Sequence, residues 1–158
     1  MKLFWIFFYF GFVSSLLADG WPEWRGPRGD GSWEGPSISK SLPEDGLKRI
    51  WKTKIFPGYS GVTVKNGLVY LMDRPANKVS EGIERVICLD AYTGSEIWDF
   101  SYPAAYSDMG YGKGPRASIT IKNGRAFGFG ARGMAFGLDA RTGKKLWMRD
   151  LVEEENAT

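Results

Sequence analysis

The 158-residue sequence contains no histidine and only one cysteine, Cys88. Without histidine, the chain can form neither a Ser-His-Asp triad nor a zinc site of the His-Glu-x-x-His type. A single cysteine rules out an intrachain disulfide and a zinc site made of several thiolates. Because Cys88 lies in the apolar run "RVICLD", we expect a buried and inert thiol at this position.

Charge clusters and long helical stretches are also missing. The formal net charge is +3, and the 21 basic and 18 acidic residues are scattered along the chain. No basic stripe with interleaved aromatic residues is present, which argues against nucleic acid as a partner. No stretch of about ten residues has helical periodicity. The sequence instead has 21 glycines, 8 prolines and 15% aromatic residues, which favours short strands joined by turns.

The first 18 residues, "MKLFWIFFYFGFVSSLLA", have the pattern of an export signal. A lysine at the second position precedes an apolar run at 3–13, and Ala18 is a small residue suited to cleavage. A membrane anchor is the alternative, but a bilayer needs about 20 apolar residues, and Ser14 and Ser15 interrupt this run. We therefore expect a cleaved signal peptide, a periplasmic or secreted chain, and no stable membrane span after cleavage.

Two phrases occur twice in the chain. "LDAYTGSEIW" at 89–98 returns as "LDARTGKKLW" at 138–147, and "VTVKNGLVYLM" is matched by "ITIKNGRAFGF". Trp51, Trp98 and Trp147 each follow an aliphatic residue, at intervals of 47 and 49 residues. The two phrases are unequally spaced because eight extra residues lie near "RPANKVSEGIE" and ten near "YPAAYSDMGYGKGPRA", as expected for surface insertions. The sequence therefore predicts two copies of one structural unit.

Each unit is predicted to form four short antiparallel strands. Asn-Gly separates the first two strands, and it is the strongest signal for a two-residue hairpin because both residues of that turn need positive φ. Aspartate, threonine and glycine in "DAYTG" and "DARTG" favour a second tight turn. The predicted strands cover residues 60–64, 68–73, 84–90 and 95–101 in the first unit, and 116–122, 125–130, 133–139 and 144–150 in the second.

Units of four strands that recur every 40 to 50 residues or so indicate β-propeller blades. A flat meander is the alternative. A tryptophan at a regular place on the last strand favours the propeller, because the ring can be buried between sheets that stack face to face. Such burial is worth roughly 3 kcal/mol or more.

The repeated phrase resembles the PQQ-like repeat of quinoprotein propellers, the tryptophan-docking motif, which in this sequence has the spacing Ala-x-Thr-Gly-x-x-x-Trp. The opening "GWPEWRGPRGDG" is also similar to the start of exported bacterial proteins of this family. A WD40 blade could be suggested by Trp-Asp at 98–99, but no Gly-His partner is present and the second copy reads Trp-Met. The matching residues are Ala91, Thr93, Gly94 and Trp98 in the first copy and Ala140, Thr142, Gly143 and Trp147 in the second.

The resemblance implies an all-β fold made of antiparallel four-stranded blades from an eight-bladed propeller, with about two blades present. We expect a signal peptide at 1–18, an irregular segment at 19–46, the PQQ-like repeats at 47–151 and a polar tail at 152–158. Closed propellers have about four to eight blades. We therefore expect this chain to be a piece of a longer propeller or to assemble with other copies.

Three functions are compatible with the resemblance, since the family includes quinone dehydrogenases and outer-membrane assembly factors of the BamB type. The favoured hypothesis is a non-catalytic scaffold that binds a protein partner or the missing blades, with no cofactor, no catalytic residue and no metal site. The alternative is a fragment of a PQQ-dependent alcohol or sugar dehydrogenase, with PQQ and calcium. The resemblance implies for such an enzyme an aspartate base, calcium ligands and often a vicinal disulfide, which one cysteine cannot form. The third is an exported carbohydrate-binding propeller, suggested by the many aromatic residues.

The glycine-rich stretch "GYGKGPRAS" at 110–118 is the candidate contact loop. It lacks the spacing of a phosphate-binding loop and precedes a predicted strand, so the helix terminus that cradles phosphate is missing. Connections on one face of a propeller line its central channel. We therefore select Tyr111 and Arg116 as the candidate ligand contacts.

The opening segment offers a second group of candidate residues. Trp21, Trp24, Arg25 and Arg28 are of types common at protein interfaces, although a segment that clasps the propeller rim would explain them equally well. Asp30, in "RGDGSW", could belong to a calcium loop, but acidic ligands are too few. We therefore interpret Asp30 as a turn residue beside glycines.

Overall fold

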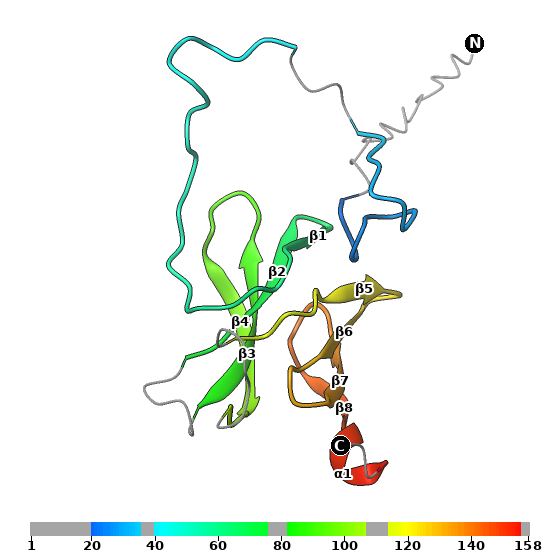
Figure 1. The fold of residues 1–158 in the computed structure, drawn as a ribbon. Helices are drawn as coiled ribbons and strands as arrows, with labels where there is room; N and C mark the ends of the chain where they lie inside the picture. The colour runs from blue at the N-terminus through cyan, green and yellow to red at the C-terminus, as the bar shows by residue number, and fades with distance from the viewer. Residues whose placement is uncertain (1–19, 36–39, 76–81, 107–113, 156–158) are drawn as a thin grey trace, which may run out of the picture.

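The computed structural model describes residues 20–35, 40–75, 82–106 and 114–155 (Figure 1). This part of the chain folds into two antiparallel four-stranded sheets, each with its strands in chain order. Among the described residues, no helix is long and apolar enough to cross a membrane. The expected signal peptide lies outside the described residues. The prediction of an all-β chain with two four-stranded units is confirmed.

The two sheets repeat the same plan of strands. The first contains β1 (Thr63–Lys65), β2 (Leu68–Asp73), β3 (Ile83–Asp90) and β4 (Glu96–Pro103). The second contains β5 (Thr120–Lys122), β6 (Arg125–Phe129), β7 (Met134–Asp139) and β8 (Lys145–Asp150). A short helix, α1 (Leu151–Glu154), follows β8 and runs into the segment predicted as a polar tail.

Both predicted turn types are confirmed. Asn66 and Asn123 have positive φ values of 52° and 50°, and a glycine with positive φ follows each of them. In the turn between β3 and β4, the Asp90 carboxylate accepts hydrogen bonds from the Thr93 amide at 2.8 Å and the Thr93 hydroxyl at 3.0 Å. Asp139 binds its threonine in the same way in the turn between β7 and β8. The local sequence alone therefore specifies these four turns.

The predicted starts of the first strand of each unit, at Ser60 and Arg116, are wrong. β1 and β5 are only three residues long. The residues before them bond to other partners: the Tyr59 amide donates to the Pro115 carbonyl at 2.9 Å, and the Met72 amide donates to the Ser60 hydroxyl at 3.2 Å. The bond from Tyr59 to Pro115 therefore joins the segments that lead into β1 and β5, while the bond from Met72 to Ser60 holds the first of these segments to its own sheet.

The main hydrophobic core lies between the two sheets. Cys88 is fully buried in it, as predicted, and burial raises the pKa of its thiol to about 12 because the thiolate is poorly solvated there. The side chains that form this core come from both units. They include Tyr70, Met72, Val86, Trp98, Ile119, Ala126, Phe136 and Leu138.

Two of the three repeated tryptophans contact the glycine turn of a four-stranded unit. The Trp98 Nε1 in β4 donates to the Ala140 carbonyl of the second sheet at 3.2 Å, and Trp51 makes the same bond to Ala91 at 2.9 Å. A Cβ atom on Gly143 would lie 2.6 Å from the Trp98 ring, so glycine is needed there for space as well as for its positive φ.

The third tryptophan differs from the other two. Trp147 is 40% exposed, whereas Trp98 is 9% exposed. Its ring packs within its own sheet, against Gly137 and at 6.3 Å from the centroid of Phe127. Burial of a tryptophan between two sheets, as predicted from the repeat, therefore applies to Trp98 and not to Trp147.

Candidate interaction surface on the inner strands

The opening segment joins the two sheets at their first strands, which we call the inner strands. The backbone of Trp21 exchanges two hydrogen bonds with Val64 of β1, at 2.7 and 3.0 Å. The next carbonyl, that of Pro22, accepts from the Ile121 amide of β5 at 2.7 Å. Figure 1 shows this segment, in blue, beside β1 and β5. Residues 20–22 therefore bind across the inner strands, where sequence reasoning had considered a clasp on the rim.

The close approach at the inner strands requires glycine at position 20. Gly20 has a φ of 68°, and a Cβ atom there would collide with the Val64 carbonyl oxygen. Below this contact, the Thr63 hydroxyl donates to the Ile119 carbonyl at 2.6 Å. The two sheets and the opening segment are thus held together at their first strands by backbone hydrogen bonds and by the Thr63 hydroxyl.

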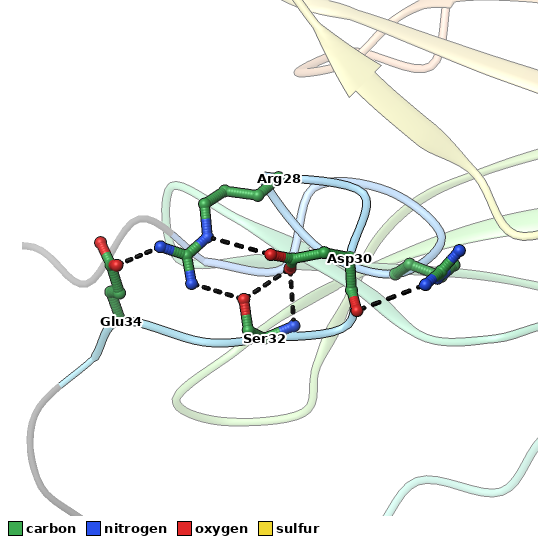
Figure 2. Close-up of polar contacts among 5 residues, drawn as sticks. Arg28, Asp30, Ser32 and Glu34 are labelled. Carbon is green, nitrogen blue, oxygen red and sulfur yellow. Dashed lines mark hydrogen bonds and ion pairs between the residues drawn. The ribbon is translucent and has the colours of Figure 1, made fainter.

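A polar network orders the loop that follows (Figure 2). The Arg28 guanidinium contacts Glu34, Ser32 and Asp30, the last at 3.6 Å. The Asp30 carboxylate accepts from the Ser32 amide at 2.8 Å, and hydrogen bonds from Ser32 lower the pKa of Asp30, with a smaller contribution from Arg28. The interpretation of Asp30 as a turn residue is therefore confirmed. Because these groups are exposed, the network fixes the loop geometry more than it adds stability.

This ordered loop presents Trp24 to solvent. The Trp24 ring is 72% exposed, and its Cε3 would lie 4.0 Å from a Cβ atom on Gly61. Tyr59 and Val62, in the segment that leads into β1, are also exposed. Trp24 therefore lies beside an exposed strip made of Tyr59 and Val62, in the segment that leads into β1.

Arg116 reaches the same strip from the other connection. Its guanidinium lies 5.5 Å from the centre of the Tyr59 ring, and its Nη1 donates to the Gly114 carbonyl at 3.2 Å. The two connections touch, since a Cβ atom on Gly114 would lie 2.7 Å from the Gly58 Cα. Trp24, Tyr59, Val62 and Arg116 together form what we call the inner surface.

Of the cation–π pair formed by Arg116 and Tyr59, sequence reasoning selected Arg116 and missed Tyr59. Arg116 is exposed on the inner surface, whereas Tyr111 lies outside the described residues. Tyr59 was missed, although the repeat contains a signal for it. "PGYSG" precedes β1 as "KGPRAS" precedes β5, so alignment of the two units places Tyr59 and Arg116 in equivalent connections.

The inner surface has the chemistry of a binding site. Exposed aromatic rings and arginine are the side chains that contribute most to protein–protein affinity. Over the residues that the structure describes, no group of three or more Cys, Asp or Glu side chains is arranged to hold a metal ion. The groups brought together at Trp24, Tyr59 and Arg116 can stack on, and form cation–π contacts with, a partner.

A buried polar cluster, absent from the sequence-based candidates, connects the two sheets. The Glu84 carboxyl group in β3 accepts hydrogen bonds from the hydroxyls of Tyr102 and Tyr106, and from the Ala131 amide of the second unit at 3.0 Å. Burial, followed by the nearby Glu84, raises the pKa of both tyrosines well above the usual range. Arg74 lies 4.2 Å from the centre of the Tyr106 ring. The buried bond from the Ala131 amide to Glu84 therefore joins the two units.

Comparisons with known proteins found partial similarities among solved structures. The chain is similar to a europium-containing methanol dehydrogenase, with 22% identity and a TM-score of 0.39 over 56% of this chain and 14% of that one. It is also similar to BamB from Moraxella catarrhalis, with 19% identity and a TM-score of 0.32 over 63% of this chain and 35% of that one. No family model and no curated protein matches the chain. The chain thus spans a small part of both structures, and similarities this weak do not decide between their roles.

Proposed function

We propose that this chain is part of an exported PQQ-like propeller that acts as a non-catalytic scaffold and binds a protein partner through the inner surface. The observation that carries the proposal is the convergence of Trp24, Tyr59 and Arg116. These residues are exposed and come from three separate segments, which backbone hydrogen bonds join to one another and to β1 and β5. A preformed aromatic surface loses little conformational entropy when a partner binds.

The propeller assignment is supported by the repeated tryptophan contacts. We interpret the bonds from Trp51 to Ala91 and from Trp98 to Ala140 as tryptophan docking between successive units. The Ala-x-Thr-Gly turns at 91–94 and 140–143 are then both occupied, and the half-exposed Trp147 would dock on a further blade. We infer that the working form is a larger propeller in which the inner strands line the central axis.

The proposal is tested by site-specific photo-crosslinking in the cell that exports the protein. Benzoylphenylalanine replaces Tyr59, and the matched control places it at Tyr92, a tyrosine in the turn between β3 and β4 that is slightly more exposed. We expect one discrete protein adduct from position 59 and none from position 92. In the position-59 protein, Trp24→Ala together with Arg116→Glu is expected to reduce the adduct at least fivefold.

Three results would contradict the proposal. Equal adducts at both tyrosines, or none at position 59, would remove the inner surface as a binding site. Binding of PQQ with calcium by the purified protein, together with reduction of an artificial electron acceptor in the presence of an alcohol, would instead establish the dehydrogenase alternative.

A further inference from the structure

A cavity of about 810 Å³ opens between the two sheets, at the end where their hairpin turns lie. Its lining comes from the turn between β1 and β2, the turn between β5 and β6, and the turn between β7 and β8. None of the four residues of the inner surface lines it. Its size falls within the range of about 300 to 1,000 Å³ that is typical of small-molecule sites.

The walls of this cavity are held by hydrogen bonds within the protein. The Tyr70 hydroxyl and the Trp98 Nε1 both donate to the Ala140 carbonyl, at 3.1 and 3.2 Å. Each of the two hairpin turns is also bonded to the next turn of its own sheet. The Ala91 amide donates to the Gly67 carbonyl and the Ala140 amide to the Gly124 carbonyl, each at 2.9 Å. A ligand would therefore enter a cavity that is already formed, with little cost of ordering.

The cavity combines an apolar interior with a polar rim. Leu68, Ile97 and Ile121 supply aliphatic surface, and the Tyr70 ring adds a flat apolar face. Such a lining accommodates the hydrocarbon body of a ligand, with the free energy gain set by the apolar area removed from water.

The rim carries positive charge and amide groups. Lys65 and Arg141 line it together with Asn66 and Asn123, and no carboxylate lines it. The nearby Asp139 carboxylate faces its own turn, where it accepts from the Arg141 amide at 3.2 Å, and hydrogen bonds from Thr142 lower its pKa. The lining thus contains two cations and no carboxylate, which suits the cavity to an anion.

We propose that this cavity is a binding site for a small organic anion, a carboxylate on an aromatic or aliphatic body. The hydrocarbon part lies against Leu68, Ile121 and Tyr70, and the carboxylate is held by Arg141 and Lys65. Arginine is the better of the two cations for this role, because its planar guanidinium can bind both carboxylate oxygens at once. The site is formed by two adjacent units alone, so it does not depend on the scaffold role proposed above.

The test is calorimetric titration of the full chain with 2-naphthoate, which has both the charge and the apolar body. Two further probes separate these features: 2-naphthamide is neutral with the same rings, and acetate is charged without them. We expect saturable binding of 2-naphthoate and at least tenfold weaker binding of both other probes. Replacement of Ile97 by tryptophan, which fills the cavity, is expected to abolish the binding.

Variants that change the charge of single residues test where the carboxylate of the ligand binds. Arg141→Glu is expected to weaken 2-naphthoate binding at least tenfold, and Arg141→Gln by less, while Lys144→Glu serves as the matched control because Lys144 lies in the same turn and does not line the cavity. Circular dichroism checks that each variant is folded. Binding of 2-naphthamide as tight as that of 2-naphthoate, an equal effect of Lys144→Glu, or no saturable binding would each overturn the proposal.

Discussion

Glu84 is a fully buried acidic residue in β3 whose partners come from three different segments. It accepts hydrogen bonds from Tyr102, Tyr106 and the Ala131 amide. The chain around it, "GIERVICLD", reads as an ordinary strand in which a glutamate would face solvent. Glu84 is instead buried. Its two carboxyl oxygens can leave water because donors that lie 18 or more residues away in the sequence bond to them.

Replacement of Glu84 by glutamine tests this role. The side chain keeps its shape, but one carboxyl oxygen is replaced by the amide NH2 of glutamine. This group cannot accept from a tyrosine hydroxyl, so a buried hydrogen bond is lost. We expect the free energy of unfolding in urea to fall by about 2 kcal/mol. Glu96→Gln, at an exposed position of β4, is the control and should change it by less than about 0.5 kcal/mol. Equal losses in the two variants would show that the cluster adds no stability.

The turns between β3 and β4 and between β7 and β8 are elements that the sequence specifies by itself. Asp90 and Asp139 each accept hydrogen bonds from a threonine three residues later, and these bonds lower the pKa of both carboxyls below 3.8. A carboxyl whose pKa is lower in the folded than in the unfolded chain stabilises the fold above the unfolded value. That stabilisation is lost as the pH falls through the folded value.

We expect the free energy of unfolding to fall at low pH, and we expect Asp90 and Asp139 to account for part of that fall. The free energy of unfolding should decrease as the pH falls below 3.8, and the double variant Asp90→Asn, Asp139→Asn should show a smaller decrease. Asparagine can still accept the hydrogen bonds but does not titrate. Urea unfolding at a series of pH values measures the slope, with Asp45→Asn as the control outside the two turns. An unchanged slope in the double variant would contradict the assignment.

For the whole molecule, the buried ring of Trp98 is one of the contacts that join the two sheets. Trp98 is buried at this contact and donates a hydrogen bond to the second sheet, whereas Trp147 is 40% exposed. The opening segment adds backbone bonds to β1 and β5, and Glu84 adds its bond to Ala131. The relative position of the sheets is therefore set by contacts from several segments of the chain.

The two tryptophans should respond differently to truncation. Trp98→Ala is expected to reduce the free energy of unfolding by about 3 to 5 kcal/mol, because it removes a buried ring and leaves a cavity between the sheets. Trp147→Ala should cost about 1 kcal/mol or less, since much of that ring already contacts water. Where Trp98→Ala does not fold, Trp98→Phe keeps the ring and loses the bond to Ala140, with an expected loss of about 1 kcal/mol. Equal costs for the two positions would show that Trp98 does not join the sheets.

Much of the fold could be predicted because its signals are local. The Asn-Gly hairpins, the Asp-x-x-Thr-Gly turns and the repeated strands follow from the φ preferences and hydrogen bonds of residues close together in the chain. Arg116 could be selected as an exposed residue for the same reason, since it lies in a connection between repeats. The repeat spacing also predicted the contact between Trp98 and the next unit.

What the sequence by itself determined, then, is the repeating unit and its turns. The tertiary structure alone decided which residues from distant segments meet. It shortened β1 and β5, brought Tyr59 to Arg116 and opened a cavity between the hairpins. The physical reason is the separation along the chain of the residues that interact. A turn is stabilised by residues within about five positions of one another, whereas these contacts form only when two sheets and the opening segment pack together.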